Sequence, residues 1–219
     1  MPTPHAASHP VEKIQACPIF PLAGAVLLPG AQLPLNIFEP RYLQMVDDAL
    51  ADARIIGMIQ PSGAGPEVEP VSLFKIGCAG RITTFNETND GRYHIVLTGL
   101  HRFSIRHELS NGLPYRTIKA DWARFSIDQQ NDKSSETVDR DVFLDAVSEF
   151  LHSASLHADE EAISNATIAS LIASLTMGGP FTPSEKQALL EAPTIADRAA
   201  CLMALMKMSG DDDPEQTIQ

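Results

Sequence analysis

The stretch that decides the fold is Pro18–Ile59, PIFPLAGAVLLPGAQLPLNIFEPRYLQMVDDALADARIIGMI. Short apolar runs at Cys17–Leu22 and Leu33–Phe38 are bounded by proline and glycine, as buried or edge strands are. Pro40 then opens an amphipathic helix, because a proline at the first helical position lacks only an N–H that would have no partner there. The apolar run Ile55–Ile59 returns the chain to a sheet. Two strands, a helix and a third strand are therefore predicted.

Beyond this stretch the period of the apolar residues changes to two, which is typical of strands. The predicted strands are Leu73–Phe85, Tyr93–Leu97, Arg102–His107 and Tyr115–Phe125. Asn89-Asp90-Gly91 and Asn111-Gly112 separate them, and both are strong turn signals because Asn and Gly tolerate the left-handed region. Strands joined by such short turns predict a strongly bent antiparallel sheet or a small barrel.

The last third of the chain has the helical period. Thr182-Pro183-Ser184-Glu185 combines an N-cap, a proline at the first helical position and a capping box, so a helix is predicted to begin there. Gly178-Gly179-Pro180 ends the helix before it, and Thr194 begins a last one. The predicted organisation is a flexible N-terminus (1–12), a β-rich barrel (13–125), a linker (126–135), a helical subdomain (136–208) and an acidic disordered tail (209–219).

Charge and composition narrow the classes of function. The chain of 219 residues has a formal net charge of −12, which disfavours nonspecific nucleic-acid binding and docking on anionic membranes. Residues 75–124 are the exception, with 8 Lys/Arg against 4 Asp/Glu. Prolines interrupt the most apolar stretch and prevent a spanning helix. Three scattered cysteines and the lack of a signal peptide predict a soluble protein of the reducing cytoplasm.

Several separated segments, in this order, resemble the N-terminal domain of Lon proteases, the LON substrate-binding domain. They are Pro18–Leu22, Leu28–Gly30, Leu33–Tyr42, Gly77–Ile82, Leu97–Phe103, Pro114-Tyr115 and, near the end, Glu185–Glu191 with Arg198. The resemblance covers about residues 14–207. It implies an α+β fold: a β-rich, PUA-like pseudo-barrel with one inserted helix, followed by a C-terminal helical bundle.

The resemblance also implies a non-catalytic module that binds unfolded or extended protein segments, with a separate ATP-dependent protease as a partner. The sequence has no Gly-x-x-x-x-Gly-Lys-Ser/Thr loop for nucleotide phosphates. The alternative is a barrel that binds a small molecule or nucleic acid, because the barrel of this family is similar to barrels associated with RNA modification. Steep loss of binding with salt would indicate phosphate contacts.

Six residues are candidates for ligand binding: Phe38, Glu39, Arg41, Tyr42, Arg81 and Arg102. Phe38 and Tyr42 would line an apolar groove beside the first helix. The four charged residues have a structural interpretation that we prefer: a carboxylate favours the start of a helix, and a strand arginine can tie down a loop.

No catalytic residue, metal site or cofactor is predicted. His94, His101 and His107 lie in the strand region without a carboxylate or cysteine at ligand spacing, and we interpret them as ordinary strand residues. No Gly-x-Ser-x-Gly elbow supports a nucleophile.

Overall fold

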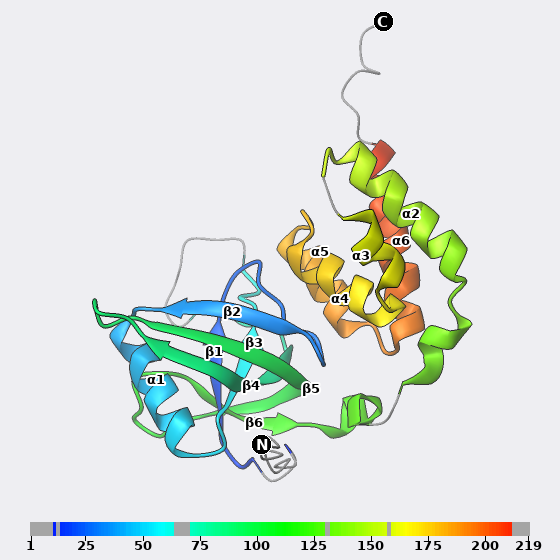
Figure 1. Cartoon of the computed structure of the whole chain (residues 1–219). Helices are drawn as coiled ribbons and strands as arrows, with labels where there is room; N and C mark the ends of the chain where they lie inside the picture. The colour runs from blue at the N-terminus through cyan, green and yellow to red at the C-terminus, as the bar shows by residue number, and fades with distance from the viewer. Residues whose placement is uncertain (1–10, 12–13, 64–70, 130–131, 157–158, 212–219) are drawn as a thin grey trace, which may run out of the picture. The chain divides into compact units, whose positions relative to one another are not determined.

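The computed structural model describes Val11 and residues 14–63, 71–129, 132–156 and 159–211. The chain divides into two compact units, residues 1–129 and 130–219. The first contains a six-stranded sheet and one α-helix, and the second is helical (Figure 1). The predicted α+β class, with a β-rich part before a helical part, is therefore confirmed.

The first unit is a barrel closed by its longest strand. Its elements are β1 (Cys17–Pro21), β2 (Gln32–Ile37), α1 (Pro40–Ala51), β3 (Ile55–Ile59), β4 (Ile76–Glu87), β5 (Tyr93–Leu109) and β6 (Thr117–Asp121). The strand order is β2-β5-β4-β3-β1-β6, and β6 pairs back onto the second half of β5. This pairing closes β5, β4, β3, β1 and β6 into a ring, while β2 pairs with the first half of β5. All pairs are antiparallel except that of β1 with β3.

Helix α1 begins at Pro40, as predicted, with Glu39 at its N-cap. Its buried stripe contains Tyr42, Met45, Val46 and Ala49. These residues recur at helical spacing, so one face of α1 packs on the barrel while the other stays in solvent.

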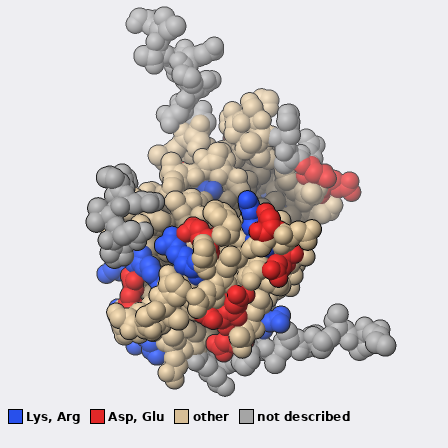
Figure 2. Space-filling view, turned by 90° about the vertical axis from the view of Figure 1, so that its left-hand side faces the viewer, with Lys and Arg blue, Asp and Glu red and all other residues tan. Residues whose placement is uncertain are grey.

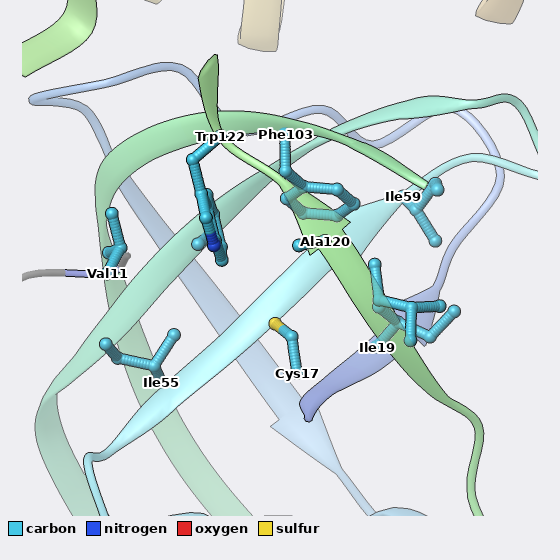
Figure 3. Packing of buried hydrophobic residues seen from close by; sticks show 10 residues of the cluster. Val11, Cys17, Ile19, Ile55, Ile59, Phe103, Ala120 and Trp122 are labelled. Carbon is cyan, nitrogen blue, oxygen red and sulfur yellow. The ribbon is translucent and has the colours of Figure 1, made fainter. Parts of the chain in front are cut away.

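Trp122 and Phe103 dominate the barrel core, where their rings meet edge to face with centroids 5.8 Å apart (Figure 3). Two glycines of the resembling segments let the backbone approach closely. A Cβ on Gly77 would meet the carbonyl oxygen of Met58 and the ring of Phe103, and a Cβ on Gly99 would meet the carbonyl of Leu28. These positions therefore need glycine for space.

Two of the predicted strand assignments are wrong. The runs at 93–97 and 102–107 belong to one continuous strand, β5, because its partner changes from β2 to β6 without a break in the strand itself. The strand predicted at 115–125 ends at Asp121, whose side chain accepts from the N–H of Ala123 at 3.1 Å and starts a turn. The 3-10 helix η2 (Ala123–Gln129) follows, and Phe125 is buried within it.

The second unit packs its helices around an apolar core of its own. Its elements are η3 (Lys133–Thr137), α2 (Arg140–Ser153), α3 (Glu160–Asn165), α4 (Ile168–Gly178), α5 (Pro183–Glu191) and α6 (Ile195–Asp211). The predicted capping box is present: Thr182 Oγ1 accepts from the N–H of Glu185 at 3.3 Å, and the Glu185 carboxylate accepts from the N–H of Thr182 at 2.7 Å.

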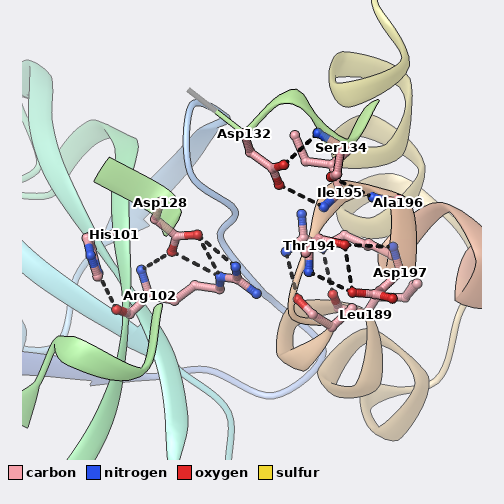
Figure 4. Close-up of polar contacts among 12 residues, drawn as sticks. His101, Arg102, Asp128, Asp132, Ser134, Leu189, Thr194, Ile195, Ala196 and Asp197 are labelled. Atoms are coloured by element: carbon pink, nitrogen blue, oxygen red, sulfur yellow. Dashed lines mark hydrogen bonds and ion pairs between the residues drawn. The ribbon is translucent and has the colours of Figure 1, made fainter. Parts of the chain in front are cut away.

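The start of α6 is capped from two sides. Thr194 Oγ1 accepts from the N–H of Asp197 at 3.1 Å, and Asp132, in the segment before η3, accepts from the N–H of Ile195 at 2.9 Å (Figure 4). Partial burial acts to raise the pKa of Asp132, but hydrogen bonds with Ser134 and with the N–H of Ile195 outweigh it and lower the pKa.

The predicted segment boundaries differ from the observed ones at several points. Val11, in the segment predicted flexible, is buried in the barrel core. The range 126–135 contains the end of η2 and most of η3, and α6 extends to Asp211, inside the predicted tail. The rest of the predicted N-terminus and tail, 1–10, 12 and 212–219, lies outside the described residues. No helix in the described part of the chain is long and apolar enough to cross a membrane.

Candidate binding site

The exposed aromatic residues of the first unit gather where β2 ends and α1 begins. Phe38 is 60 % exposed, and the Arg92 guanidinium lies 5.9 Å from the centre of its ring. Tyr93 follows Arg92 and meets Phe85, which is 41 % exposed, edge to face at 4.9 Å. We call Phe38, Phe85, Arg92 and Tyr93 the aromatic cluster. It presents two apolar rings to solvent, with a cation beside one of them.

The register of the sheet brings these four residues to the same end of the sheet. Ile37, next to Phe38, pairs with Tyr93, and Tyr93 pairs on its other side with Glu87. The ends of β2 and β4 therefore flank the start of β5, and the chain that leaves β2 places Phe38 beside the β4–β5 turn. Gly91 in this turn has a φ of 77°, as the predicted turn requires.

Three of the predicted site residues surround the start of α1 in different environments. Glu39 and Arg41 form an exposed ion pair at 2.9 Å, and such pairs contribute little to stability. The Arg41 guanidinium also lies 4.6 Å from the centre of the Tyr42 ring. Tyr42 itself is buried and packs edge to face on Phe20 at 4.5 Å. Glu39 and Arg41 are accessible beside Phe38, whereas Tyr42 belongs to the core.

Arg81 and Arg102 lie elsewhere in the barrel. Arg81 is half-buried on β4, opposite Ile55 on one side and Thr98 on the other. Thr98 is five residues from Tyr93 along β5, which corresponds to about 17 Å. Arg81 is therefore not brought to the aromatic cluster, and Arg102 is still farther along β5.

Arg102 is 1 % exposed and is held by Asp128 of η2 (Figure 4). The Asp128 carboxylate accepts from Nη2 at 2.7 Å, from Nε at 3.0 Å and from the backbone N–H of Arg102 at 2.8 Å. The guanidinium also lies 4.2 Å from the centre of the Phe125 ring. These contacts tie η2 to β5 between the parts of β5 that pair with β2 and β6. In this environment Arg102 has no surface to offer a ligand.

Acidic and basic side chains lie next to one another on the face shown in Figure 2. Several arginines of the basic section are paired: Arg106 with Asp121 at 3.5 Å, and Arg116 with Glu108. A track of unpaired cations is what a phosphate backbone requires, so this arrangement does not favour nucleic acid. Among the described residues, no group of three His, Cys, Asp or Glu side chains is placed to hold a metal ion.

The comparison with known families decides what kind of domain this is. Residues 16–208 match the ATP-dependent protease La (LON) substrate-binding domain. This chain belongs to that family.

The solved structures and curated sequences that are similar to this LON substrate-binding domain also come from Lon proteins. The Lon N-terminal domain protein from Xanthomonas campestris has the same fold, with a TM-score of 0.63 and 24% identity over 87% of this chain and 98% of its own. The N-terminal domain of Mycobacterium avium complex Lon protease has a TM-score of 0.61 at 13% identity, over 90% of this chain and 98% of its own. Lon protease 2 of Sorangium cellulosum is 28% identical over 94% of this chain. The chain spans 26% of the length of that relative.

The sequence did not single out three residues of the aromatic cluster, nor the partner of Arg102. Phe85, Arg92 and Tyr93 flank the predicted Asn-Asp-Gly turn, and their pairing with β2 was the missing information. Asp128 lies in the range predicted as a linker, where no period marks a buried residue. The turn signal alone could have identified Arg92 as a residue near a hairpin end.

Proposed function

We propose that this LON substrate-binding domain acts by binding, not by catalysis, and that its clients are unfolded or extended protein segments. The observation that carries the proposal is the aromatic cluster, because exposed aromatic rings give a large contact area at small entropic cost. A client delivered in this way would be degraded by a separate ATP-dependent protease in the cytoplasm.

Unfolded clients fit this surface for a physical reason. Folded proteins bury their large apolar side chains, whereas an unfolded segment offers them to any exposed ring. Phe38 and Phe85 can pack against such side chains, and the Arg92 guanidinium, which forms an exposed ion pair with Asp90 at 3.0 Å, can also face an aromatic ring of the client. The surface therefore selects for exposed apolar residues without requiring one sequence.

The test is fluorescence anisotropy of a labelled model protein, chemically unfolded in one sample and folded in the other, at two salt concentrations. Selective binding of the unfolded form that persists at high salt supports the proposal, since an apolar contact is not screened. Binding that falls steeply with salt would instead favour the nucleic-acid or other phosphate-binding alternative.

Phe38→Ala is the decisive variant. Loss of an aromatic anchor typically costs about 2 kcal/mol of binding free energy, so we expect the dissociation constant to rise at least about tenfold. Because Phe38 is 60 % exposed, the melting temperature should change by less than about 3 °C. The matched control is Val142→Ala, which removes an apolar side chain 57 % exposed on α2. Unchanged binding by Phe38→Ala would refute the role of the cluster.

A further inference from the structure

A pocket of about 180 Å³ opens in the first unit beside the C-terminal half of α1. Its apolar walls come from α1, β1, β3, residues next to these elements, and the segment between β5 and β6. They are formed by Ala16, Pro18, Ala49, Ala53, Ile55 and Leu113. Two carboxylates, Asp48 and Asp52, stand on the α1 side of this pocket, and both are exposed.

A hydrogen bond fixes one of these carboxylates. The hydroxyl of Tyr115, in the wall opposite, donates to Asp48 Oδ2 at 2.6 Å. Burial and this hydrogen bond raise the pKa of Tyr115, so the phenol remains a protonated donor even in alkaline solution. Asp48 is thereby held at the pocket, with its other oxygen available to a ligand.

The electrostatics of the pocket favour a cation. Asp52 is the C-cap of α1 and Asp48 lies in its last turn, where the helix dipole is negative and no basic residue stands. Among the ion pairs between residues that the structure describes, none involves either carboxylate. Two negative charges and a negative helix end thus converge on one apolar pocket.

The size of the pocket limits the class of ligand. Sites for cofactors and drug-sized molecules are about 300–1,000 Å³, so a nucleotide does not fit. A cavity of about 150 Å³ accommodates benzene, so 180 Å³ suffices for one side chain. An apolar wall with charge at its mouth matches a long side chain that buries an aliphatic stem and keeps a charged head in water.

We propose that this pocket binds a lysine or arginine side chain of an extended protein segment, with Asp48 and Asp52 facing the cationic head. As a site for client residues, this inference rests on the proposed function. The inference adds a chemical preference to the proposed function: a client would present a basic residue as well as an apolar one.

The probe for the test is the capped peptide acetyl-Gly-Ser-Lys-Ser-Gly-amide, titrated into ¹⁵N-labelled full chain and followed by amide chemical shifts. We expect saturable shifts at Asp52, Asn111 and Leu113, which line the pocket, with a dissociation constant of about a millimolar for one side chain. The same peptide with acetyl-lysine, which has no charge, should bind at least tenfold more weakly. Equal binding of the two peptides, or shifts confined to other regions, would overturn the inference.

Asp48→Asn and Asp52→Asn should each weaken the lysine peptide several-fold. An asparagine at 48 can still accept from Tyr115, so the pocket should keep its shape. The matched control is Asp47→Asn, which removes the same charge from the same helix at a position that does not line the pocket. If the control weakens binding as much as the two pocket variants do, the peptide responds to overall charge and the assignment fails.

The peptide has no apolar side chain, so its binding does not require the aromatic cluster. Phe38→Ala should therefore leave its affinity unchanged. Binding of the unfolded model protein without binding of the peptide would refute the pocket as a lysine site and leave the proposed function standing. Binding of the peptide without binding of the unfolded protein would refute the proposed function and leave the pocket standing.

Discussion

Arg102→Met should destabilise the barrel unit severely, because it leaves the Asp128 carboxylate buried without its partner. The side chains of the two residues are 2 % and 6 % exposed. Breaking a buried pair from one side costs about 3–5 kcal/mol, since the remaining charge is not compensated. At roughly 3–5 °C per kcal/mol for a unit of this size, the melting temperature should fall by about 10–20 °C.

Trp122 makes this loss measurable in the barrel unit alone. It is the single tryptophan of the chain and packs on Phe103 in the barrel core. The midpoint of its fluorescence change in urea therefore reports unfolding of the first unit. Arg106→Met is the matched control: the same substitution on the same strand removes an ion pair of 3.5 Å whose arginine is 60% exposed. It should cost less than about 1 kcal/mol.

A second substitution tests the reason for the loss. Arg102→Met combined with Asp128→Asn removes both charges, while the asparagine can still accept from the backbone N–H of residue 102. We expect the double variant to recover at least about 2 kcal/mol relative to Arg102→Met. If Arg102→Met leaves the Trp122 midpoint unchanged and abolishes client binding instead, the structural role is refuted and Arg102 contacts ligand.

Three further predictions follow from burial and local geometry. Burial raises the pKa values of Cys17 and Cys78 to about 12, so in native protein at pH 8 both thiols should resist a disulfide reagent. The less buried Cys201 should react with the reagent first, and Cys201→Ser should remove this early phase of the reaction. Fast reaction of two or more thiols would contradict the prediction. Gly99→Ala should prevent native folding of the barrel, seen as a lost Trp122 transition, because its Cβ would overlap the Leu28 carbonyl. Thr182→Ala should cost about 1 kcal/mol, measured by helical circular dichroism, and an unchanged melting curve would argue against the capping box.

The fold could be predicted well wherever local rules and the tertiary structure agree. The capping box at Thr182, the proline start of α1 and the turn at Gly91 each follow from a backbone requirement that few residues meet. The continuity of β5 could not be predicted in this way. Its length depends on two partners, β2 and β6, that are distant in the sequence and cover its two halves in turn.

The candidate site was harder to predict, because exposure of a side chain depends on what covers it. Asp128 illustrates the difficulty. It lies in a polar stretch with no apolar period, yet three donors of Arg102 converge on its carboxylate. When the partner of a buried charge is distant in the sequence, the residues next to that charge along the chain do not indicate that it is buried. The acidic end of α1 did carry a signal, because Asp48 and Asp52 stand where a helix favours cations.

Phe38 and Tyr42 show most directly what sequence periodicity can and cannot decide. Both are aromatic and four residues apart, which would place them on one face if a single helix contained them. The helix begins at Pro40, so Tyr42 joins its buried stripe with Val46, while Phe38 stands outside the helix at the end of β2. An apolar residue that lies outside every helix and strand is not covered by a periodic pattern, so the sequence does not show whether it is buried. Its 60 % exposure makes Phe38 the residue at which binding and stability should separate.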